Sequence, residues 1–166
     1  MPLHLIFIHG GILSGLITVA MLFIIIKGPR IMLQDYPKEI QDMVPPKSKE
    51  EKKATWIYGA PFLMVAIGGP ALLGWHYLQA SNLNFVSLFV YVYGLLLVFN
   101  VYDLIILDWL LFCTITPRFV VIPGTEGSKG YKNYRFHFVG FLKGFLYTLV
   151  MALVISSLLI ALQSIL

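Results

Sequence analysis

Four long apolar stretches constrain this chain more than any other feature. They cover residues 5–26, 55–78, 85–115 and 137–166. Each is longer than the roughly 20 residues that a helix needs to cross a bilayer. The sequence therefore predicts an all-α fold, an integral membrane four-helix bundle, forming a single transmembrane domain over residues 1–166.

The composition agrees with this prediction. Of the 166 residues, 58% are hydrophobic and only 12% are charged, whereas about a quarter of a soluble domain is charged. So few polar groups cannot cover a soluble surface. The single cysteine, Cys113, excludes an internal disulfide and any two-cysteine redox or zinc motif within one chain.

The basic residues indicate an orientation rather than a nucleic-acid partner. All twelve Lys and Arg fall in or beside two loops, residues 27–54 and 116–136. Loops rich in Lys and Arg stay on the cytoplasmic side during insertion. We therefore expect both loops to be cytoplasmic, both termini to lie outside (N-out/C-out), and the protein to reside in a bacterial cytoplasmic (inner) membrane.

Gly11 and Gly15 form a G-x-x-x-G pair in the first span. Small residues at this spacing let another helix backbone approach closely. Ordinary packing within the chain explains the pair equally well. We expect this helix to be the contact surface if the chain binds a membrane-protein partner or a second copy of itself.

The third span contains Asn100, Asp103 and Asp108. A charged carboxylate near the bilayer centre costs at least ~2.5–3.5 kcal/mol, so these acids should face protein, water or a partner. At about 100° per residue, the two acids point about 140° apart on an α-helix and are not expected to chelate one ion by themselves. Each acid could simply hydrogen-bond a neighbour, but ionisable residues within a membrane are candidates for function.

The loop after the third span supplies the other candidate site residues. Glu126 and His137 join Asp103 and Asp108 as candidate catalytic residues, because carboxylates with a histidine can move a proton or bind a metal. The GTEGSK segment is not a nucleotide P-loop, because it lacks the required spacing before its lysine. Candidate substrate-binding residues, for a lipid head group, are Asn100, Arg118, Lys129, Tyr131, Tyr134 and Arg135. The alternative is that the basic and aromatic members only set topology and form an interfacial belt.

The sequence predicts no particular metal or cofactor. No dense H-x-x-x-H or E-x-x-H pattern is present. His9 and His76 would both lie towards the outer side and could be axial ligands of a haem. Packing or an interfacial position explains each of these histidines as well.

Three functions follow from these features. We rank first the binding or modification of a membrane lipid or other amphiphile at the inner leaflet, because the polar residues outside the first loop converge there. The alternatives are a non-catalytic subunit of a membrane complex and a small proton- or ion-coupled transporter. Whether the protein is an enzyme stays open at this level.

Overall fold

The computed structural model describes residues 3–80 and 84–166, and in this part of the chain the regular elements are all helices. The all-α prediction is therefore confirmed. In chain order the elements are α1 (Leu3–Lys27), the 3₁₀ helix η1 (Pro29–Asp35), α2 (Lys38–Gln41), α3 (Lys49–Leu63), the π-helix η2 (Met64–Gly68), α4 (Gly69–Ala80), α5 (Phe85–Tyr102), the π-helix η3 (Asp103–Ile115), the 3₁₀ helix η4 (Lys129–Lys132) and α6 (Tyr134–Ile165).

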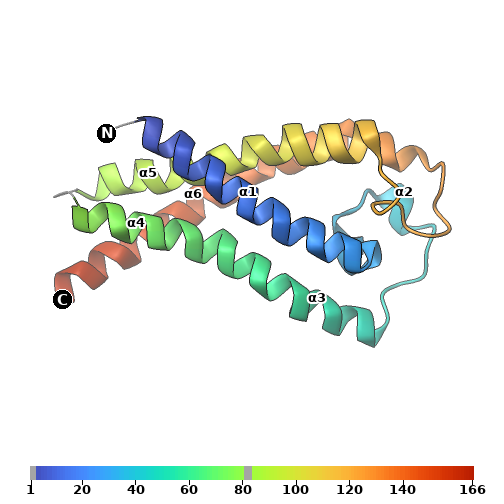
Figure 1. The fold of residues 1–166 in the computed structure, drawn as a ribbon, viewed down its shortest axis with the longest axis horizontal. Coiled ribbons are helices and arrows are strands. Elements are labelled where there is room, and N and C mark those ends of the chain that lie inside the picture. Colours follow the sequence, from blue (N-terminus) through green and yellow to red (C-terminus); the bar gives the residue numbers. More distant parts are fainter. Residues whose placement is uncertain (1–2, 81–83) are drawn as a thin grey trace.

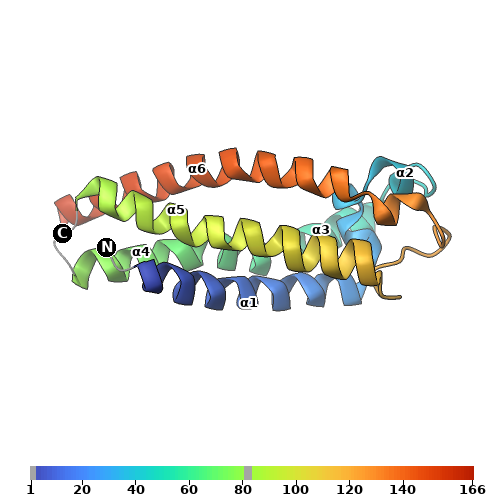
Figure 2. The same cartoon turned by 90° about the horizontal axis from the view of Figure 1, so that it is seen from above.

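These elements join into four continuous helices that are long and apolar enough to cross a membrane: Leu3–Lys27, Lys49–Ala80, Phe85–Ile115 and Tyr134–Ile165. By length and composition the chain is an integral membrane protein. The chain end after α6 and the start of α1 lie at one end of the bundle, and the two long loops lie at the other (Figures 1 and 2).

The second and fourth helices begin earlier than the sequence predicts, at 49 rather than 55 and at 134 rather than 137. Both starts are set by capping side chains. Ser48 and Glu51 form a reciprocal capping box, and Asn133 accepts a hydrogen bond from the Phe136 N–H. Such caps satisfy N–H groups that have no partner within the helix.

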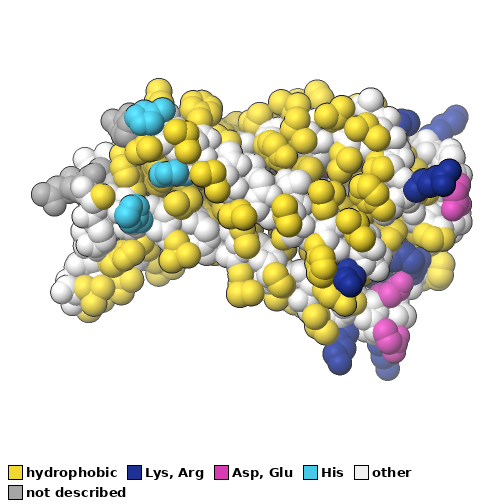
Figure 3. Space-filling view, viewed as in Figure 1, with side chains coloured by type: hydrophobic (Ala, Val, Ile, Leu, Met, Phe, Trp, Pro, Cys, Tyr) yellow, Lys and Arg dark blue, Asp and Glu magenta, His cyan; other side chains and the backbone are white. Residues whose placement is uncertain are grey.

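Charge is distributed very unevenly along the bundle. Figure 3 shows the Lys, Arg, Asp and Glu side chains gathered at the loop end, while hydrophobic side chains cover the middle. Exposed apolar residues such as Phe7, Leu72 and Leu158 belong to this surface. A lipid-facing belt of this kind is expected of a membrane protein, and the side of the membrane on which the loops lie stays a prediction.

In the half of the bundle near the termini, α5 packs between α1, α4 and α6. Its side chains Leu88, Val92 and Leu95 are fully buried in a continuous apolar core. A polar contact between α1 and α5 in this half joins His9 Nδ1 to Tyr91 Oη at 2.5 Å. This half is therefore a solid, closely packed region.

The two loops fold against each other and form a small second core, which we call the loop cap: Ile25, Leu33, Tyr36, Ile40, Val120, Ile122 and Tyr131. Tyr36 Oη donates to the Val120 carbonyl at 2.8 Å, across the two loops. Tyr131 Oη accepts from the Ile122 N–H at 2.9 Å. The first of these buried bonds joins the two loops, and the second stabilises the fold of the second loop.

Candidate functional site: an acidic cavity

A cavity of about 440 Å³ lies in the half of the bundle near the loops, and we call it the acidic cavity. There α3 packs on α1 and η1, while α6 packs on α5 and η3, and residues from both groups line the cavity. Its polar lining residues are Gln34, Asp35, Asn100, Asp103, Asp108 and His137. Aromatic residues from α3 and α6 form much of the remaining wall: Phe62, Phe136, Phe141 and Tyr147.

Asp103 and Asp108 line this cavity together. The prediction that they point about 140° apart was wrong because it assumed an α-helix. Residues Asp103–Ile115 form a π-helix, in which each bond spans five residues, so that residues five apart lie near one turn. The bonds from the Thr116 N–H to the Leu111 carbonyl (2.9 Å) and from Thr114 Oγ1 to the Trp109 carbonyl (2.7 Å) have this spacing. π-Helical turns are rare and frequently occur at functional sites.

Asp108 and His137 form a carboxylate–histidine dyad. His137 Nδ1 lies 2.8 Å from Asp108 Oδ1, and the His137 side chain is only 6% exposed. A carboxylate at Nδ1 holds the ring proton on that nitrogen, so Nε2 of the neutral ring is a hydrogen-bond acceptor. The ring of Phe112 packs against the imidazole at a centroid distance of 4.9 Å and fixes its orientation.

Two buried polar atoms of the acidic cavity have no hydrogen-bond partner among the described residues: Asp103 Oδ1 and His137 Nε2. Nearly all buried polar atoms in proteins have a partner, because desolvating one without compensation is costly. Both atoms belong to residues that line the same cavity. They therefore indicate a partner that comes from outside the chain.

Asn100 enters the site through a close approach of α5 and α6. Its Nδ2 donates to the Phe141 carbonyl at 3.2 Å. The neighbouring Gly144 provides the space, since a Cβ at that position would lie 3.0 Å from Asn100 Cγ and overlap the amide oxygen. A glycine is thus required for this amide to reach the cavity wall.

Asp35 is a cavity residue that sequence reasoning missed. Its side chain is accessible from the cavity, yet the surrounding protein removes enough water to raise its pKa, and the charge of Asp108 raises it further. A hydrogen bond from Gln34 and the charge of Lys47 partly offset this rise. The first loop contains several acids, and the buried bond of the adjacent Tyr36 to the other loop helps to hold this one at the site. The sequence feature that points to Asp35 is the aromatic Tyr36 beside it in a polar loop.

The structure places Glu126 away from this group. Glu126 is exposed, and its Oε2 accepts from the Gly124 N–H at 2.9 Å within its own loop. Of the four candidate catalytic residues, Asp103, Asp108 and His137 line the cavity and Glu126 does not. The turn at Gly124, with φ of 86°, directs this loop back on itself.

The candidate head-group residues of the second loop are also dispersed. Arg118 and Lys129 are exposed and do not line the acidic cavity. Tyr131 is buried in the loop cap, and the Tyr134 hydroxyl bonds Thr114 at 3.0 Å. These four residues and Arg135 lie outside the cavity, so Asn100 is the one predicted substrate-binding residue among its described lining residues.

Arg135 lies in a separate, adjoining pocket of about 370 Å³, together with Lys143. This pocket shares Phe136 and Gly140 with the acidic cavity. The basic side chains of this pocket and the acidic side chains of the acidic cavity therefore line two neighbouring but distinct spaces beside α6.

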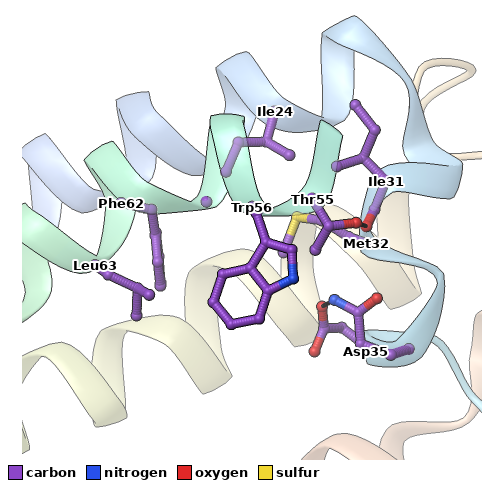
Figure 4. Close-up of a pocket in the computed structure, with 10 residues that line it drawn as sticks. Ile24, Ile31, Met32, Asp35, Thr55, Trp56, Phe62 and Leu63 are labelled. Atoms are coloured by element: carbon purple, nitrogen blue, oxygen red, sulfur yellow. Dashed lines mark hydrogen bonds between the residues drawn. The ribbon is translucent and has the colours of Figure 1, made fainter. Parts of the chain in front are cut away.

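A third space, an apolar pocket of about 210 Å³, opens between α1, η1 and α3 (Figure 4). It shares Met32, Gln34, Asp35 and Phe62 with the acidic cavity. In Figure 4 the Trp56 ring projects from α3 towards the segment that carries Asp35. Ile24, Ile31 and Leu63 are among its apolar lining residues.

Among residues 3–80 and 84–166, no group of three His, Cys, Asp or Glu side chains is arranged to hold a metal ion. His9 is bonded to Tyr91 and His76 is exposed, as expected for packed and interfacial histidines. Comparison of the chain with known protein families, curated proteins and solved structures gives no match.

Proposed function

We propose that this membrane protein binds an amphiphile, with the polar head in the acidic cavity and the hydrocarbon chain in the apolar pocket. The observation that carries the proposal is the adjacency of the two spaces, which share the lining residues Met32, Gln34, Asp35 and Phe62. A ligand that fills both must have a polar end and an apolar end. Membrane lipids are the abundant molecules of this kind around a transmembrane protein.

The dyad gives the site a means of moving a proton at the head group. Asp108 orients His137 through Nδ1, which leaves Nε2 as the basic nitrogen. A histidine held in this way can accept a proton from a hydroxyl or an amine placed within hydrogen-bond reach. The same geometry therefore supports an enzyme that modifies the bound amphiphile.

The packing of the bundle favours this function over ion-coupled transport. Between Asn100 and the end of the bundle near the termini, the core around α5 is filled by buried apolar residues such as Leu88, Val92 and Leu95. An ion crossing this region would leave its polar partners behind, which is costly in a low-dielectric interior. An amphiphile needs access from one side only.

The loop end of the bundle would face the cytoplasm if the charge asymmetry sets the orientation, so the site would serve the inner leaflet of a bacterial cytoplasmic membrane. A role within a complex is compatible with this site. Gly11 and Gly15 are exposed on α1, and a Cβ at either position would meet no atom within 4 Å. This face is therefore available to another helix.

The test is the amphiphile content of the purified protein. We expect mass spectrometry in mild detergent to show an amphiphile bound to the wild type, and at least tenfold less of it in Asp108→Asn. Asp42→Asn is the matched control, because this exposed acid pairs with Lys38 outside the cavity. Equal amounts in all three proteins, or none in any, would refute the proposal.

A further inference from the structure

The charge of the acidic cavity restricts the head groups it can take. Asp35, Asp103 and Asp108 line it, and among the described residues no Lys or Arg does so. Lys47, whose charge acts on Asp35, donates to the Gln34 side chain and to the Ile31 carbonyl, the latter at 2.7 Å. Carboxylates that share one cavity repel each other, and a cation between them relieves that repulsion. An anionic phosphate would add to it.

The hydrogen-bonding capacity of the site leads to the same class of ligand by a different argument. Its two unpartnered buried atoms, the carboxylate oxygen Asp103 Oδ1 and His137 Nε2, are both acceptors, because the His137 ring proton is held on Nδ1 by Asp108. The missing partner must therefore be a donor. A primary ammonium has three N–H donors and a secondary ammonium has two, whereas a quaternary ammonium has none.

We infer that the acidic cavity takes the primary or secondary ammonium group of a long-chain amine. The N–H groups would donate to Asp103 Oδ1 and His137 Nε2, and the neighbouring carboxylates would balance the charge. The alkyl chain would pass Met32 and Phe62 into the apolar pocket beside Trp56. This inference rests on the proposed function and specifies its substrate class.

The experiment compares four probes that share one chain: dodecylamine, dodecyltrimethylammonium, dodecanol and dodecyl phosphate. Dodecylamine is protonated at neutral pH, like the lysine side chain. We expect calorimetry on the full chain in nanodiscs to show it binding at least tenfold more tightly than any other probe. Asp103→Asn should weaken its binding at least tenfold.

Lys143→Gln is the matched control for charge, because Lys143 lies in the adjoining pocket. It should leave dodecylamine affinity unchanged or slightly raised. Asp35→Asn, a change at an exposed loop position, provides the same test of the charge requirement if Asp103→Asn fails to fold.

The outcomes separate this inference from the proposed function. If the trimethylammonium, alcohol or phosphate probe binds as tightly as the amine, and the binding depends on the cavity residues, the ammonium assignment is wrong and amphiphile binding stands. If no probe binds in a way that depends on Asp103 or Asp35, and no amphiphile co-purifies, both the ammonium assignment and the proposed amphiphile binding are wrong.

Discussion

Replacing Gly144 by alanine should destabilise the contact between α5 and α6 at the acidic cavity. The new methyl group would lie 3.0 Å from Asn100 Cγ and overlap the amide oxygen. Asn100 is only 9% exposed and donates to the Phe141 carbonyl, so it has little room to move. Overpacking typically costs about 1–3 kcal/mol. The lost hydrogen bond adds roughly 0.5–1.5 kcal/mol, and the better helix propensity of alanine returns about 1 kcal/mol.

The net expectation is therefore a loss of about 0.5–3.5 kcal/mol, which corresponds to a drop in Tm of roughly 1–14 °C for a chain of this length. Thermal unfolding in detergent can be followed with a thiol-reactive dye, because the single cysteine, Cys113, is fully buried until the protein unfolds.

Gly140→Ala is the matched control for this prediction. Gly140 lies one turn earlier on α6, and a Cβ there would meet no atom within 4 Å. Its Tm should stay the same or rise. Adding Asn100→Ala to Gly144→Ala should recover part of the loss, because the two residues are in contact and their effects are not additive. Equal Tm values for the two glycine variants would refute the reasoning.

Two further predictions concern the loop cap and the cavity acid that it positions. Tyr131→Phe should lower the free energy of unfolding by about 1–3 kcal/mol in the same thermal assay, because it leaves the buried Ile122 N–H without its acceptor. Tyr134→Phe, at an exposed hydroxyl, is the control and should change Tm little. Similar losses in both variants would contradict this account. NMR titration should place the pKa of Asp35 above the ordinary value of about 3.9, and Lys47→Gln should raise it further, since the lysine charge lowers it. Folding then favours protonated Asp35, so its contribution to the free energy of unfolding should fall as pH rises from the ordinary to the raised pKa; an ordinary value in the folded protein would contradict this.

Much of the fold could be predicted because its signals are local. An uninterrupted apolar stretch identifies a membrane helix by its length, and the clustering of Lys and Arg needs no knowledge of the packing. Asp108 and His137 could be chosen for a related reason, since each is an ionisable residue beside or within such a stretch. The structure brings these two residues together at 2.8 Å.

The composition of the site was decided by tertiary structure. The π-helical geometry of Asp103–Ile115, which α-helical periodicity does not predict, brings two carboxylates to one cavity. The loop cap adds Asp35 and leaves Glu126 outside. Hydrophobic length and charge act on each segment separately, so the sequence by itself determined four membrane helices with their charges at one end. Which polar groups meet depends on contacts between segments far apart in the chain, and only the packed structure contains these contacts.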